Sequence, residues 1–108
     1  MTVDRNKAPD YQKLFQTLLN KTEAGKLRWE ETASEDTFLA AVKGQQSFEL
    51  RPVPGSASIH LTVRDAAGKV LFEVNEGGAG RELYKFARRL ALRIDDKLEN
   101  SLELLSQL

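Results

Sequence analysis

The hydrophobic period of this sequence changes twice along the chain, and this change constrains the fold more than any other feature. Apolar residues recur every three to four positions near the N-terminus, every second position between residues 27 and 75, and every three to four positions again from residue 80 onward. A period of 3.6 puts apolar side chains on one stripe of a helix, and a period of 2 puts them on one face of a strand. The pattern therefore predicts an α+β fold, with a helix before a sheet and a long helix after it.

The N-terminal part of the chain divides into an arm and a helix. Residues 1–8 are polar and show no periodicity, so we expect a disordered arm. Residues 10–24 have the helical spacing, and Gly25 is suited to end the helix in a left-handed conformation. The apolar stripe of this predicted helix consists of Tyr11, Leu14, Phe15, Leu18 and Leu19.

Residues 27–75 predict a four-stranded antiparallel meander, because four alternating segments are separated by turn residues. When the apolar faces of the first two strands are placed on the same side of the sheet, Val42 lies opposite Gln46 in the first hairpin. The same rule places Leu50 near Ile59 in the middle pair. A Pro54-Gly55 pair between these strands suits a type II turn.

Two details of the sheet follow from the same alternation. A four-residue Asp65–Gly68 loop predicts that Leu61 opposes Phe72 in the last hairpin. The segment around Trp29 fits either a further edge strand or an extended connector. We expect the indole of Trp29 to pack over one end of the core, with its N–H bonded near the rim.

Residues 80–107 predict one long helix that packs on one face of the sheet and extends beyond it. The part of this helix that extends beyond the sheet has an apolar stripe of Leu98, Leu102 and Leu105. An exposed apolar patch of this size is larger than the surface of a monomeric protein normally has. We predict that these side chains form a homodimer interface. A fold-back after Asn100-Ser101 would cover them within one chain. Leu39 and Leu71, on the sheet face away from the helices, are further predicted interface residues.

Composition excludes several classes of function. The 108 residues suit a single domain, and 16 basic against 16 acidic residues argue against nucleic-acid binding. Without cysteine and with one histidine, the chain lacks most metal sites and nucleophilic triads, so we expect no metal, no cofactor and no enzymatic activity. No apolar run is long enough to span a bilayer, and no signal peptide is apparent, so we expect a cytoplasmic protein without a membrane partner.

Two polar features have both a chemical and a simpler interpretation. Gly78, Gly80 and Arg81 lie in a glycine-rich loop before the last helix, where backbone N–H groups could bind an anion. The loop lacks the spacing of established phosphate motifs, which favours a plain hinge. His60 is expected on the polar face of its strand as an uninvolved surface residue, since its local sequence contains no partner for catalysis.

The segments K-L-R-W-E-E-T at 26–32, D-A-A-G at 65–68 and L-Y-K-F-A-R-R-L-A-L at 83–92 resemble those of a family of small, uncharacterised bacterial proteins. In that family a W-x-x-T segment opens a short meander, and an L-Y-x-x-A-R-R-x-A-L helix closes it. The resemblance implies a bacterial or phage source and a small α+β domain, and it implies no activity.

We therefore expect a non-catalytic protein-interaction module that self-associates as a homodimer and can bind a further, unidentified protein partner. The alternative is a small anion- or ligand-binding domain that uses the glycine-rich loop.

Overall fold

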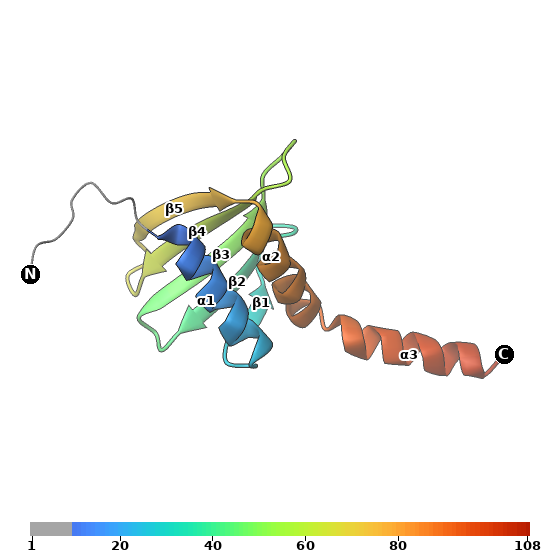
Figure 1. The fold of residues 1–108 in the computed structure, drawn as a ribbon. Helices are drawn as coiled ribbons and strands as arrows, with labels where there is room; N and C mark the ends of the chain where they lie inside the picture. Colours follow the sequence, from blue (N-terminus) through green and yellow to red (C-terminus); the bar gives the residue numbers. More distant parts are fainter. Residues whose placement is uncertain (1–9) are drawn as a thin grey trace, which may run out of the picture.

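The computed structural model describes residues 10–108, which form three helices and five strands (Figure 1). The predicted arm at residues 1–8 lies outside the described residues. In chain order the elements are α1 (Tyr11–Glu23), β1 (Trp29–Glu31), β2 (Phe38–Val42), β3 (Gln46–Pro52), β4 (Ile59–Asp65), β5 (Val70–Glu76), α2 (Gly78–Ala91) and α3 (Ile94–Ser106).

The first helix has the ends that the sequence predicts. Asp10 is the N-cap of α1, and its side chain accepts a hydrogen bond of 2.9 Å from the backbone N–H of Lys13. Such a bond satisfies one of the N–H groups that a helix start leaves without a partner. After α1, Gly25 adopts a φ of 71°, the left-handed conformation that terminates many helices.

The sheet is an antiparallel meander in the order β1-β2-β3-β4-β5. It has five strands and not the four predicted, because the Trp29 segment is an edge strand and not a connector. Trp29 lies opposite Ala40 of β2, so the short β1 extends the apolar face of the sheet by one residue.

Strand registers follow the predicted faces, with two differences in position. Val42 opposes Gln46 in the first hairpin, as expected. Leu50, however, opposes Leu61 and not Ile59, which pairs with Pro52. The expected type II turn is present between these strands, since Gly55 has a φ of 72° and Ser56 N–H bonds to the Val53 carbonyl at 3.1 Å.

The last hairpin differs from the prediction by two residues. Leu61 opposes Val74, and Phe72 opposes Val63. The turn is one residue tighter than expected, because Asp65 N–H bonds to the Lys69 carbonyl at 2.9 Å. A β-bulge at the Val63/Arg64 position then adds a second residue to β5. Two shifts of one residue leave Phe72 and Val74 on the predicted face, since strand faces alternate with a period of two.

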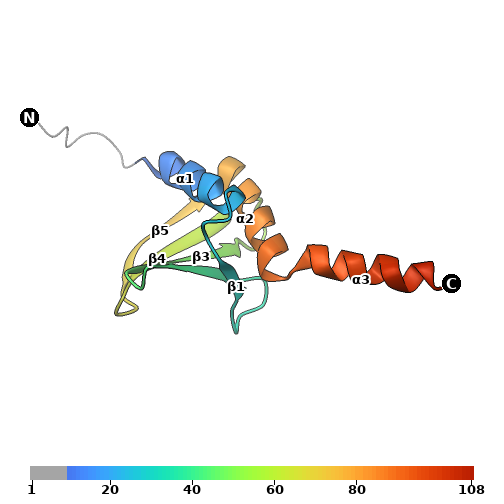
Figure 2. The same ribbon diagram turned by 90° about the horizontal axis from the view of Figure 1, so that it is seen from below.

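Both α1 and α2 cover the same face of the sheet, and its other face is open (Figure 2). Leu83 and Ala87 of α2 are completely buried against this face together with Phe15 of α1. Apolar side chains from both layers form one core: Phe15, Leu18, Leu19, Trp29, Phe38, Ala40, Phe48, Leu50, Ile59, Leu61, Val63, Leu83 and Ala87.

The predicted single helix at 80–107 is instead two helices, α2 and α3. Helix α2 ends with Leu92 as its C-cap, and the next residue, Arg93, has the left-handed angles φ 53° and ψ 47°. This conformation turns the backbone, so α3 leaves the sheet at an angle and extends away from the rest of the chain (Figures 1 and 2). The break lies at Leu92–Arg93, and α3 continues without a fold-back through Asn100-Ser101.

Candidate interaction surface

Helix α3 is amphipathic but has no buried residue. Leu98, Leu102 and Leu105 are 56%, 59% and 63% exposed, and their spacing of four and three residues puts them on one side of the helix. Leu104 and Leu108 are also exposed. The structure therefore brings the three residues of the predicted C-terminal interface together, and within one copy it leaves them uncovered.

One exposed ion pair spans the junction between α2 and α3, and a second lies in the first turn of α3. Arg89 Nε lies 2.9 Å from Asp95 Oδ1, and a second guanidinium nitrogen donates to Oδ2 at 3.2 Å. Hydrogen bonding to Asp95 is also the main reason that the pKa of Arg89 is raised. Arg93 pairs with Asp96 at 3.2 Å. Asp95 and Asp96 lie in the first turn of α3, where carboxylates interact favourably with the helix dipole.

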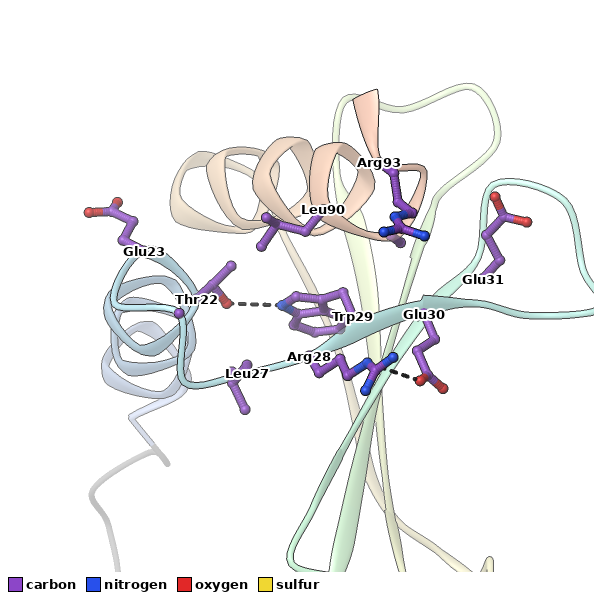
Figure 3. A pocket seen from close by; sticks show the side chains of 11 residues that line it. Thr22, Glu23, Leu27, Arg28, Trp29, Glu30, Glu31, Leu90 and Arg93 are labelled. Atoms are coloured by element: carbon purple, nitrogen blue, oxygen red, sulfur yellow. Dashed lines mark hydrogen bonds and ion pairs between the residues drawn. The ribbon is translucent and has the colours of Figure 1, made fainter. Parts of the chain in front are cut away.

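A groove of about 790 Å³ lies beside this junction, at the end of the domain from which α3 departs. The C-terminal end of α1, the edge strand β1 and the C-terminal end of α2 form its walls (Figure 3). Leu27 and Leu90 contribute apolar surface, and Leu90 is 44% exposed. Arg28 and Arg93 are the basic lining residues, and Glu23, Glu30 and Glu31 are the acidic ones.

Trp29 fixes the floor of the groove. Its side chain is only 3% exposed, and the indole Nε1 donates a hydrogen bond of 3.0 Å to Thr22 Oγ1 (Figure 3). The Thr22 hydroxyl in turn donates to the Leu18 carbonyl at 2.7 Å. Trp29 therefore packs over one end of the core with its N–H bonded, as the sequence predicts, and it joins the end of α1 to the sheet edge.

The open face of the sheet carries a polar network. His60 interacts through Nδ1 with Asn75 Oδ1 and through Nε2 with Glu73 Oε1, the latter at 3.2 Å. The hydrogen bond with His60 is the main reason that the pKa of Glu73 lies below its ordinary value. His60 lies on the polar face of its strand, as predicted, but its side chain is only 15% exposed, and the partners that its local sequence lacks come from the neighbouring strand. Arg64 and Glu49 form a further ion pair at 3.2 Å on this face.

The structure does not bring the predicted sheet-face residues together. Leu39 lies on β2 and Leu71 on β5, and strands β3 and β4 separate them. Between them, the polar side chains of Glu49 and Thr62 continue the row that begins at Leu39. Leu71 is 45% exposed beside Val70, next to the bulge.

The predicted glycine-rich loop is wrong for Gly78, Gly80 and Arg81, because these residues form the first turn of α2, where Gly80 has a packing role. A Cβ atom on Gly80 would lie 3.2 Å from the Glu76 side chain and 3.4 Å from Phe15, so the missing side chain allows α2 to approach α1 closely. A Cβ atom on Gly78 would have no neighbour within 4 Å, and Arg81 is exposed. Glu76 comes directly before the N-cap Gly77, and its negative charge opposes anion binding at this helix start.

Residues 10–108 contain neither a cluster of metal-ligating side chains nor a helix suited to cross a membrane. No group of three or more histidine, cysteine, aspartate or glutamate side chains is arranged to hold a metal ion. No helix there combines the length and the apolar composition that a bilayer span requires.

The sequence did not predict the groove, because three segments distant in the chain form it. Leu27 and Leu90 are ordinary apolar residues in their own segments, and nothing in either segment indicates that the other lies opposite. The single tryptophan, Trp29, was the one signal in the sequence, because it was expected to pack over one end of the core.

Comparison with known proteins adds no relative. No protein-family model matches this chain, and no curated protein and no solved structure matches it. The resemblance to small bacterial proteins therefore stays a prediction, and any function has to be argued from the surface described above.

Proposed function

We propose that this chain is a non-catalytic self-association module, in which α3 joins two copies of the α+β domain. One observation carries the proposal. Helix α3 has the amphipathic pattern of a packed helix, yet none of its residues is buried in the single copy. An isolated helix of 13 residues is marginal in water, so its apolar side requires a packing partner.

The apolar stripe (Ile94, Leu98, Leu102, Leu105 and Leu108) is self-complementary, which favours a second copy over an unrelated partner. In a two-fold dimer each helix supplies the same surface to the other, so one stripe covers its equivalent. Three half-exposed leucines from each copy meet at the centre of such a pair. The acidic residues Asp95 and Asp96 are near one end of α3, outside this stripe.

An antiparallel arrangement of the two helices suits this chain better than a parallel one. Paired helices lie about 8–10 Å apart. In a parallel pair, Asp95 and Asp96 would lie beside the same carboxylates of the partner, and both folded domains would crowd one end. An antiparallel pair places the domains at opposite ends and separates the acidic turns by about 15 Å, from 1.5 Å of rise per residue.

The non-catalytic part of the proposal rests on the state of the one histidine. Both ring nitrogens of His60 are engaged, by Asn75 and Glu73, and the ring is mostly buried. A general base needs a ring nitrogen that can reach a substrate proton.

Sedimentation equilibrium of the wild-type chain and of the Leu102→Glu/Leu105→Glu variant tests the proposal. We expect a wild-type dimer at tens of micromolar and a folded, monomeric variant, because both side chains are exposed in the single copy and tolerate a charge there. A wild-type monomer at that concentration, or a variant that remains dimeric, would refute the proposal.

A further inference from the structure

The groove beside the α2–α3 junction follows the outer edge of β1. All three residues of β1 line it, namely Trp29, Glu30 and Glu31. Successive side chains of a strand point to opposite faces of the sheet, so a groove that all three line runs along the edge of the strand. β1 is the first strand in the sheet order, and this edge therefore has no neighbouring strand.

The backbone along this edge is unpaired in the part of the chain that the structure describes. β1 pairs only with β2, and no turn or loop hydrogen bond there involves the backbone of residues 28–31. An open strand edge presents N–H and C=O groups that can bond to an additional strand, and extended peptides bind to other sheet edges in this manner. The last turns of α1 and α2 lie beside the edge and offer side-chain contacts as well (Figure 3).

Apolar surface that an added strand can bury lies on the helix side of this edge. Leu90, near the end of α2, is 44% exposed and lines the groove, and Trp29 forms the groove floor. An apolar side chain on this side of an added strand, placed opposite Trp29, would pack against Leu90.

The groove has unbalanced negative charge. Its two arginines are already paired with carboxylates of the chain, at 3.5 Å for Arg28 and at 3.2 Å for Arg93. Glu23 and Glu31 also line the groove, and neither has an ion-pair partner among residues 10–108. The C-terminal ends of α1 and α2 add the partial negative charge of two helix ends. Basic side chains complement such a site.

The acidic and apolar groups follow a fixed order along the groove. In Figure 3, Leu90 lies between Glu23 on one side and Glu31 on the other. Every second side chain of an extended segment is on the same face. From this order we infer that an extended segment of a partner protein, with a basic, an apolar and a basic side chain at every second position, adds to the outer edge of β1. This contact goes beyond the proposed self-association and leaves α3 free for a second copy.

The end-blocked peptide S-K-T-L-T-K-S has this pattern, and fluorescence anisotropy of its labelled form measures binding to the full chain. It should bind at least about tenfold more tightly than S-E-T-L-T-E-S, which reverses the charges, and than S-K-T-S-T-K-S, which lacks the apolar side chain. Equal binding of the three peptides, or no saturable binding of the first, would overturn the inference.

Substitutions in the groove locate the contact. Leu90→Lys should weaken binding of S-K-T-L-T-K-S about tenfold, because it removes apolar surface and repels the basic side chains. Leu71→Lys is the matched control, since Leu71 is 45% exposed but lies on β5 at the opposite edge of the sheet. Its affinity should stay within about twofold of the wild type. Equal affinities of the two variants would rule out the groove as the binding site.

Charge reversal tests the acidic groups. Glu23→Lys/Glu31→Lys should weaken binding about tenfold. Glu82→Lys/Glu99→Lys makes the same change in net charge at exposed residues outside the groove, and its effect should stay within about twofold. Equal losses in both double variants would show a general charge effect and contradict the inferred pattern.

Backbone methylation tests the pairing with β1. Amide groups of alternate residues point to opposite edges of a strand, so only one alternate set in the peptide can bond to β1. A peptide methylated at both threonine amides and one methylated at the lysine and leucine amides should differ about tenfold or more in affinity. Equal affinities would overturn strand addition. The Leu102→Glu/Leu105→Glu variant should bind the peptide as the wild type does, so failure of this contact and failure of the α3 dimer are distinguishable.

Discussion

Truncation of one leucine on α3 should separate dimerisation from folding. In the single copy, 59% of the Leu102 surface is exposed, and no residue of α3 is buried. Complete burial of a leucine side chain contributes about 1.5–3 kcal/mol relative to full exposure. Dimerisation can therefore gain only the part that is still exposed, and it gains this part once in each copy.

For Leu102→Ala, this reasoning gives a loss of about 2–3.5 kcal/mol per dimer. The dissociation constant should rise about 30- to 400-fold. The free energy of unfolding of the monomer should change by less than about 0.5 kcal/mol, because the substituted side chain is more than half exposed in the single copy.

Sedimentation velocity over a concentration series measures the dissociation constant. Urea unfolding at protein concentrations below the dissociation constant measures the free energy of unfolding of the monomer. Asn100→Ala is the control, since Asn100 is exposed on the side of α3 opposite the stripe and should leave both quantities unchanged. The reasoning is refuted if Leu102→Ala dimerises as tightly as the wild type. It is equally refuted if the substitution destabilises the monomer, because Leu102 would then be buried within one chain.

Three further predictions concern the domain. Leu61→Ala should lower the free energy of unfolding by about 2–5 kcal/mol in urea titrations, because Leu61 is completely buried; a loss below about 1 kcal/mol would contradict the described core. In thermal melts, Gly80→Ala should destabilise by about 1–3 kcal/mol through crowding, whereas Gly78→Ala should be neutral or gain up to about 1 kcal/mol; equal effects would argue against close packing at Gly80. Because the pKa of Glu73 is lowered by its bond with His60, the bond stabilises the fold above the ordinary glutamate range and is lost as the pH falls through the lowered pKa. Between neutral pH and a pH below about 4, the melting temperature of the Glu73→Gln variant should therefore fall less than that of the wild type. Identical pH profiles of the two proteins would contradict this bond.

Local signals accounted for the parts of the fold that the sequence predicted well. Asp10 and Gly25 are end signals for α1 that depend only on neighbouring backbone. The first hairpin register followed from matched faces around a short turn. The exposed leucines of α3 were also predictable, because the helical period outlasts the sheet.

The differences arise where no local signal exists. Arg93 has no side-chain feature that predicts a left-handed φ, and the helical period continues through it, so one helix was expected in place of two. The bulge in β5 is similarly hidden, since Leu71 fits the alternation as well as its neighbours do. Trp29 joined the sheet because of its partner Ala40, which lies in another strand.

Contacts between segments distant in the chain, such as the polar network of the open sheet face and the contact of α2 with the loop before β2, were the hardest to predict. Glu73 and Asn75 face His60 only because β4 and β5 pair in a register that the bulge sets. Tyr84 donates to the Asp36 carbonyl at 2.8 Å, which ties α2 to the loop before β2. Neither pairing follows from the spacing of these residues in the chain.

The left-handed backbone of Arg93 determines the direction in which α3 extends from the domain. The helix extends about 20 Å from this one residue, so a rotation of about 10° there moves its tip by about 3–4 Å. A dimer joined through α3 contains two such pivots in series. In the proposed dimer, the angle between the two sheets would depend on the φ and ψ of Arg93 in each copy, and small changes there would alter the shape of the assembly without altering either domain.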